Sequence, residues 1–183
     1  MKKIYFVITN TGTIVSKIVK HFMKDEYTHI SISLDRELSQ MYSFGRLNPY
    51  NTFKGGFVHE YIDKGTFKRF YKTKSRICYI EVTDSQFTSL KKQIKHFKNN
   101  KKKYKFNVIG LFAIYFNIKR KKENYFYCAE FVKYVLEKSK IYLDLPELVR
   151  PQHFSELENI TEIYKGVLRE YPTKAVQNVE NVL

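Results

Sequence analysis

The chain has 183 residues, of which 43% are hydrophobic and 16% aromatic. This composition excludes an intrinsically disordered protein, and the length suits one domain with its own hydrophobic core. We therefore expect a single domain over residues 1–183. Only two cysteines are present, Cys78 and Cys128. That number excludes a disulfide framework and a zinc site made of paired cysteines.

The charge is strongly positive, because 33 lysines and arginines outnumber 18 acidic residues and leave a formal net charge of +15. Such an excess favours anionic partners such as nucleic acid, anionic lipid or a wall polymer, or it only solvates the surface. The apolar run at the start is too short for a signal peptide. The longest apolar run, at 108–116, is far below the roughly 20 residues of a membrane span. We expect a cytoplasmic protein without a transmembrane segment.

The first part of the chain predicts strands around one helix. The run KKIYFVIT at 2–9 is typical of a buried strand, and residues 14–24 carry apolar side chains at helical spacing. Residues 28–35 alternate isoleucine and leucine with histidine and serine, as in a half-buried strand. The stretch QMYSFG at 40–45 is the expected hairpin partner of that strand.

The pattern then changes from strands to helices. We expect a loop at 46–56, strands at 57–62 and 66–72, and another strand at 76–83. A helix follows to residue 100, with Asp84 or Ser85 as its cap. A second, more buried helix is expected at 108–118, an exposed loop at 119–124 and a last helix from Cys128. Consecutive strands followed by helices indicate an α+β fold with an antiparallel sheet or barrel packed against helices.

Cys128 begins the apolar stripe of the last helix, since apolar residues follow it at the third, fourth, seventh and eighth positions. One interpretation is a packed core residue, because free cysteines are among the most buried residue types. The other is a nucleophile, because the free N–H groups and the dipole at a helix start favour a thiolate and could hold an oxyanion. A nucleophile requires a facing base.

Five histidines could supply that base. His29 is the first candidate, because it opens the strand at 28–35 on the polar face that it shares with serines. His59, in the strand FVHEY, is the second. His21 and His96 have basic neighbours, and His153 follows a proline in an expected loop. A surface or core role remains the alternative for each of them.

The segment YTHISISLD, followed by MYSFGR and about 100 residues later by NYFYCAEFVKYVL, resembles the circularly permuted papain-like hydrolases. These are the permuted NlpC-type enzymes, which include the YiiX/YaeF-like group and, more distantly, the lecithin–retinol acyltransferase-like proteins. The resemblance covers most of the chain, from about residue 4 to residue 154. It rests on the order of the motifs, because a histidine-bearing strand precedes the cysteine helix. It implies a permuted papain-like fold with the nucleophile at a helix N-terminus.

The resemblance also implies roles for single residues. Cys128 matches the nucleophile and His29 the general base. In the family a polar residue on the next strand orients the histidine, often His, Glu or Gln. That strand has no acid or histidine here, so either Ser43, Tyr42 or Gln40 serves or the third role is absent, and we favour Ser43. Glu130, within CAEF, is expected to have a structural role.

Aromatic residues are the expected walls of the cleft. The candidates for substrate binding are Tyr27, Tyr42, Tyr125 and Tyr127, and the hydroxyl of Tyr27 or Tyr125 could support the backbone N–H of Cys128 at an oxyanion. We expect no metal and no cofactor, because no spacing of metal-ligating residues is present.

The function expected from these residues is that of a cysteine-dependent hydrolase, an amidase or peptidase that acts on a small peptide, an amino-acid amide or a cell-wall fragment. One alternative is a thiol acyltransferase or lipase of the lecithin–retinol acyltransferase type. Another is a non-enzymatic basic binding protein, because residues 90–106 carry eight lysines among aromatics. Nucleic acid is not an expected partner, since that segment also fits the solvated face of a helix. The oligomeric state stays open.

Overall fold

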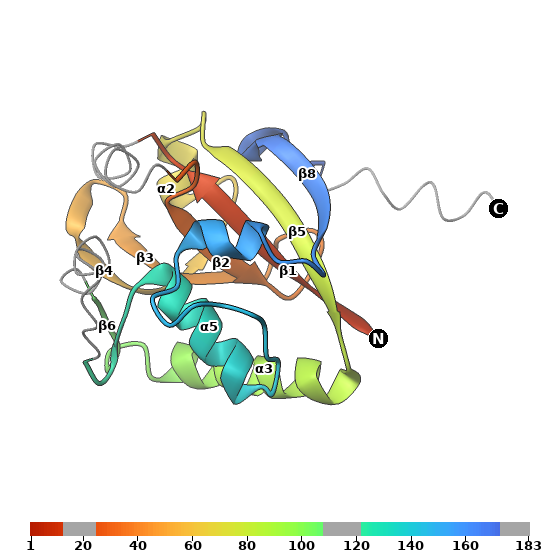
Figure 1. Cartoon of the computed structure of the whole chain (residues 1–183). Helices are drawn as coiled ribbons and strands as arrows, with labels where there is room; N and C mark the ends of the chain where they lie inside the picture. Colours follow the sequence, from red (N-terminus) through yellow and green to blue (C-terminus); the bar gives the residue numbers. More distant parts are fainter. Residues whose placement is uncertain (13–24, 108–121, 173–183) are drawn as a thin grey trace.

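The computed structural model describes residues 1–12, 25–107 and 122–172. Its centre is a six-stranded antiparallel sheet with the order β4-β3-β2-β1-β5-β8. Figure 1 shows β4 towards one end of this sheet and β8 at the other. The strands are β1 (Lys2–Asn10), β2 (His29–Ser33), β3 (Met41–Asn48), β4 (Asn51–Glu60), β5 (Lys74–Val82) and β8 (Thr161–Val167).

Helices and a small second sheet complete the described chain. A two-stranded parallel sheet pairs β6 (Lys105–Phe106) with β7 (Tyr125–Phe126), the strand that leads into the cysteine helix. Figure 1 shows α3 and α5 beside each other on one face of the large sheet. The helices are α2 (Gly65–Arg69), α3 (Asp84–Asn99), α5 (Cys128–Lys138), η2 (Pro151–Ser155) and η3 (Leu168–Glu170).

The large sheet has an apolar cluster on each face. Successive side chains along a strand point to opposite faces, and apolar residues occur at both sets of positions. The larger cluster joins β2 residues such as Ile30 and Ile32 to the inner stripes of α3 and α5. The smaller cluster lies on the other face, where Phe67 of α2 and Leu168 of η3 cover Tyr5. The sheet is therefore packed on both sides, and β2 takes part in the core between sheet and helices.

The α+β class with an antiparallel sheet is confirmed at this coarse level. The strand at His29, its hairpin partner and the start of α5 at Cys128 are also as predicted. The predicted helices at 14–24 and 108–118 lie in segments that fall outside the described residues. In the described part of the chain, no helix is long and apolar enough to cross a membrane.

Three local predictions were wrong. The stretch 66–72 is largely helical, because most of it belongs to α2. This helix begins after a turn at Gly65, whose φ of 56° is positive and suits a glycine. The expected loop at 46–56 is mostly strand, because β3 and β4 pair almost to their common turn. The cap of α3 is Thr83, whose hydroxyl accepts the Gln86 N–H, rather than Asp84 or Ser85.

Phe44 of β3 lies in the middle of the aromatic core between sheet and helices. It is fully buried, and its ring centroid lies 5.2 Å from that of Phe131, 5.3 Å from Phe126 and 6.0 Å from Phe97. We expect Phe44→Ala to lower the free energy of unfolding by about 3–5 kcal/mol, because it removes buried area and leaves a cavity. Urea denaturation measures this change.

The matched control is Tyr142→Ala, because the Tyr142 side chain is 77% exposed. We expect this substitution to change the free energy of unfolding by no more than about 0.5 kcal/mol. Equal effects of the two substitutions would contradict the importance of the aromatic core.

Candidate functional site

Cys128 is the first residue of α5, as the sequence predicted. Tyr127 precedes it with an extended backbone, and the Glu130 carboxylate accepts the Tyr127 N–H at 3.4 Å. This contact closes the start of the helix and gives Glu130 a structural role at the motif CAEF. The Cys128 side chain is only 3% exposed and packs at the edge of the apolar cluster under α5.

His29 is the first residue of β2 and lies against a buried carboxylate that the sequence analysis did not consider. Its Nε2 atom lies 3.2 Å from both carboxylate oxygens of Glu60, at the end of β4. The Ser31 hydroxyl donates a hydrogen bond to Glu60 Oε2 and lies 3.4 Å from His29 Nε2. Glu60 is therefore held by two neighbours from the same strand.

The two charges stabilise each other, although burial opposes both of them. Burial by itself would lower the pKa of His29, but the Glu60 carboxylate and hydrogen bonds from Cys128 and Glu60 raise it from 6.5 to about 10. Burial by itself would raise the pKa of Glu60, but His29, Ser31 and Ser43 lower it below its usual value. At neutral pH the pair is an imidazolium and a carboxylate.

The structure brings Cys128 and His29 together. Helix α5 packs on β2, and Cys128 lies close enough to the His29 ring to contribute to its raised pKa. Three side chains from α5, β2 and β4 thus form a chain of contacts in the order sulfur, imidazole, carboxylate.

Ser43 lies beside Glu60, and its hydroxyl helps to lower the pKa of that carboxyl. Its oxygen is buried, and no hydrogen bond of ordinary length and angle reaches it. Gly45, two residues further along β3, provides the space for this arrangement. A Cβ atom there would lie 3.2 Å from Glu60 Oε1, 3.3 Å from Ser43 Oγ and 3.4 Å from His29 Cε1.

The other described histidines lie away from Cys128. His59 stacks on Tyr42, and its ring nitrogens contact the Ser39 carbonyl and the Tyr61 hydroxyl, each at 2.8 Å. Hydrogen bonds join His96 to Tyr104 and His153 to Arg150. His21 lies outside the described residues. Of the four described histidines, His29 is the one whose pKa responds to Cys128.

The four tyrosines predicted to bind substrate occupy two environments. Tyr27, Tyr42 and Tyr127 are buried in the core between sheet and helices. Burial raises the pKa of Tyr27 to about 12 and also raises the pKa values of Tyr42 and Tyr127. Tyr125 is only partly buried, and it lines a cavity on the outer side of α5.

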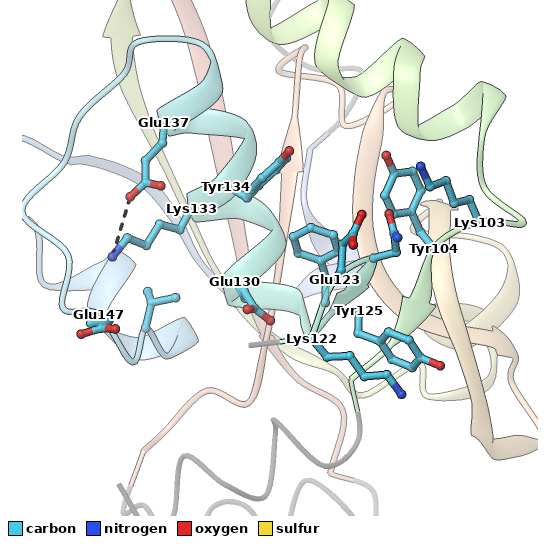
Figure 2. Close-up of a pocket in the computed structure, with 13 residues that line it drawn as sticks. Lys103, Tyr104, Lys122, Glu123, Tyr125, Glu130, Lys133, Tyr134, Glu137 and Glu147 are labelled. Carbon is cyan, nitrogen blue, oxygen red and sulfur yellow. Dashed lines mark ion pairs between the residues drawn. The ribbon is translucent and has the colours of Figure 1, made fainter. Parts of the chain in front are cut away.

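That cavity has a volume of about 550 Å³ and does not include Cys128, His29 or Glu60. In Figure 2, Lys133 reaches Glu137 on one side, at 3.8 Å, while Lys122 and Tyr125 lie on the other. Its lining mixes aromatic rings with charges of both signs. The residues are Lys103, Tyr104, Lys122, Glu123, Asn124, Tyr125, Phe126, Glu130, Lys133, Tyr134, Glu137, Glu147 and Val149.

No protein-family model matches the sequence, and no curated protein matches it significantly. The site must therefore be interpreted from its own geometry. Within residues 1–12, 25–107 and 122–172, no group of three or more histidine, cysteine or acidic side chains could hold a metal ion. The contacts among Cys128, His29 and Glu60 are suited to proton transfer and to nucleophilic attack.

The His29–Glu60 pair predicts a defined pH dependence of stability. A raised histidine pKa contributes stability that is complete below 6.5 and is lost as the pH rises through about 10. The lowered carboxyl pKa contributes stability that is complete above 4.5 and is lost as the pH falls through the lower value in the folded protein. Both contributions are complete only between about pH 4.5 and 6.5.

We expect Glu60→Gln to lower the free energy of unfolding by about 3 kcal/mol in that pH range, because it leaves His29 buried without its counter-charge. The difference from the unchanged protein should shrink as the pH approaches about 10. Urea denaturation across a pH series measures it. A difference that stays constant over this series would contradict a charged pair.

Gly45→Ala tests the packing of the pair directly. The added methyl group would press on Glu60, Ser43 and His29, so we expect the pKa of His29 to fall towards its ordinary value. Titration of the imidazole protons by nuclear magnetic resonance measures this. Gly56→Ala is the matched control on the paired strand, because its methyl group would meet only the flexible end of Leu47. A fall of equal size in both variants would contradict this packing argument.

Proposed function

We propose that the protein is a cysteine-dependent hydrolase with a permuted papain-like fold, in which Cys128 is the nucleophile, His29 the proton carrier and Glu60 the residue that orients it. The observation that carries the proposal is that His29 lies against the buried Glu60 carboxylate and also has its pKa raised by Cys128, the cysteine at a helix start. The order of the histidine strand before the cysteine helix adds to it. Ser43 then supports Glu60, whose pKa it helps to lower.

The raised pKa of His29 suggests how the proton is arranged before reaction. The pKa of His29 is raised to about 10, so the imidazole keeps its proton at neutral pH. In the proposed mechanism the charged form of His29, an imidazolium, lies beside the Cys128 sulfur, where a cation supports a reactive cysteine. Glu60 stabilises this form, because it is the main cause of the raised pKa.

The proposed reaction is acyl transfer to sulfur followed by hydrolysis. The Cys128 sulfur attacks the carbonyl carbon of an amide or ester, and the negative charge moves to the carbonyl oxygen. His29 donates its proton to the leaving nitrogen or oxygen as that bond breaks. Neutral His29 then accepts a proton from water, which attacks the thioester and releases the acid.

The start of α5 supplies the positive environment for the developing oxyanion. The first N–H groups of a helix have no acceptors within the helix, and the dipole of α5 points its positive end towards Cys128. The backbone N–H of Cys128 is therefore our candidate donor to the oxyanion. The proposed substrate is a small peptide, an amino-acid amide or a cell-wall fragment, and the proposed location is the cytoplasm.

A thiol acyltransferase or lipase is the second candidate, because the same three residues would form the same thioester. The difference lies in the acceptor, which would be an amine or alcohol in place of water. A purely basic binding protein is less well supported. The exposed lysines of α3 lie opposite its buried residues Leu90, Ile94 and Phe97, as on the solvated face of an ordinary amphipathic helix.

Alkylation of the two cysteines tests the proposal within one molecule. We expect iodoacetamide to label Cys128 selectively below about pH 7.5, since a thiolate is the reacting species. Cys78 is the internal control, because burial raises its pKa to about 11. Mass spectrometry of the labelled peptides measures both sites. Labelling of Cys78 as fast as Cys128 would contradict an activated Cys128.

Activity on a panel of amides and esters tests the three roles. We expect Cys128→Ala and His29→Ala to abolish turnover, and Glu60→Gln to lower kcat by about 10²–10⁴-fold, as is typical for loss of a group that supports acid–base catalysis. Circular dichroism checks that each variant is folded. Turnover that survives in Cys128→Ala would exclude the proposed mechanism.

A further inference from the structure

The turn between β3 and β4 presents exposed apolar side chains. Tyr50 is 79% exposed and Leu47 is 51% exposed, and Tyr71, which follows the end of α2, is 55% exposed. Among the described residues only two other large apolar side chains are as exposed, and one of them is the N-terminal methionine. Exposed apolar side chains that gather in one place are typical of an interaction surface.

Arginines lie beside Tyr50 and Phe70 and join the turn to the end of α2. The Arg69 guanidinium lies 4.2 Å from the centre of the Tyr50 ring and donates to the Pro49 carbonyl at 2.6 Å. Arg46 and Arg69 both lie over the Phe70 ring, at 5.5 and 5.2 Å. We call this group of Arg46, Leu47, Tyr50 and Arg69 the hairpin-tip surface.

The charge around the hairpin-tip surface is almost entirely positive. Residues 46–74 contain seven lysines and arginines and two acids, and one of those acids is the buried Glu60. Arg46 and Arg69 are close enough for Arg69, together with burial as the larger cause, to lower the pKa of Arg46. Like charges held this near each other are stabilised by an anionic partner.

We propose that the hairpin-tip surface docks the protein onto an anionic lipid bilayer. Tyrosine and leucine at the tip can enter the interface between headgroups and acyl chains, while the arginines contact the anionic headgroups. Nucleic acid fits less well, since an exposed leucine adds nothing to phosphate contacts and the Tyr50 ring is already covered on one face by Arg69. The proposal does not depend on the proposed hydrolase activity.

This surface lies on the same two strands that carry part of the candidate site. Gly45 is adjacent to Arg46 on β3, and Glu60 is the last residue of β4. Docking through the tip would therefore hold the His29–Glu60 pair at a fixed position relative to the bilayer. A lipid-anchored or membrane-adjacent acyl compound would then be within reach of the site.

Co-sedimentation of the full chain with vesicles tests the proposal. We expect binding to phosphatidylcholine vesicles that contain phosphatidylglycerol, much weaker binding to phosphatidylcholine alone, and a decrease with added salt. Because a cation near such a surface contributes about 1 kcal/mol, Arg69→Glu should weaken binding at least about fivefold. Tyr50→Ser combined with Leu47→Ser should weaken it comparably while leaving the net charge unchanged.

Two control variants separate the tip from the charge of the whole protein. Lys95→Glu reverses an exposed charge on α3, and Tyr142→Ser removes a 77% exposed ring elsewhere. Both should bind vesicles almost as the unchanged protein does. The proposal is overturned if Lys95→Glu weakens binding as much as Arg69→Glu, or if the apolar double variant binds normally. Preferential binding of a nucleic-acid oligonucleotide over the vesicles would also overturn it.

Discussion

The arrangement of the candidate site depends on one interaction, the buried ion pair between His29 and Glu60. Burial opposes both charges, so neither group would be ionised in this position without the other. The pair therefore fixes where β4 lies relative to β2, although β3 separates these strands in the sheet. Ser31 and Ser43 surround the carboxylate, and Gly45 leaves the space that the pair occupies. The polar cluster is thus as closely packed as the apolar core.

The alternation of polar and apolar side chains along β2 separates the polar cluster around Glu60 from the apolar core. Ile30 and Ile32 enter the core under α5, whereas Ser31 lies with the Glu60 carboxylate. A shift of one residue in the pairing of β2 would exchange the two sets and bury polar groups in the apolar cluster. The register Thr9 to His29 and Ile32 to Tyr42 therefore determines both the packing and the site.

The sequence was sufficient to predict the strand at His29 and the helix start at Cys128, because each element has a clear periodic pattern. It did not lead to Glu60. That residue reaches His29 only through the pairing of β3 with β4, and the stretch 46–56, which forms the part of this pairing next to the turn, was predicted as a loop. An acid in the largely apolar run FVHEYI was the available signal. Charges inside apolar strands usually have a partner, and the partner is set by register, which local patterns do not fix.

The two cysteines are both buried, but their thiol groups lie in different surroundings. Cys78 lies in the middle of β5, where burial outweighs the nearby Arg76 and raises the pKa to about 11. Cys128 is also buried, but it lies at the positive end of α5 and against an imidazole that Glu60 keeps protonated. In the proposal, Glu60 acts on the sulfur only through His29. In the proposed mechanism the reactivity of Cys128 is a property of the β2–β3–β4 arrangement as much as of the helix that carries it.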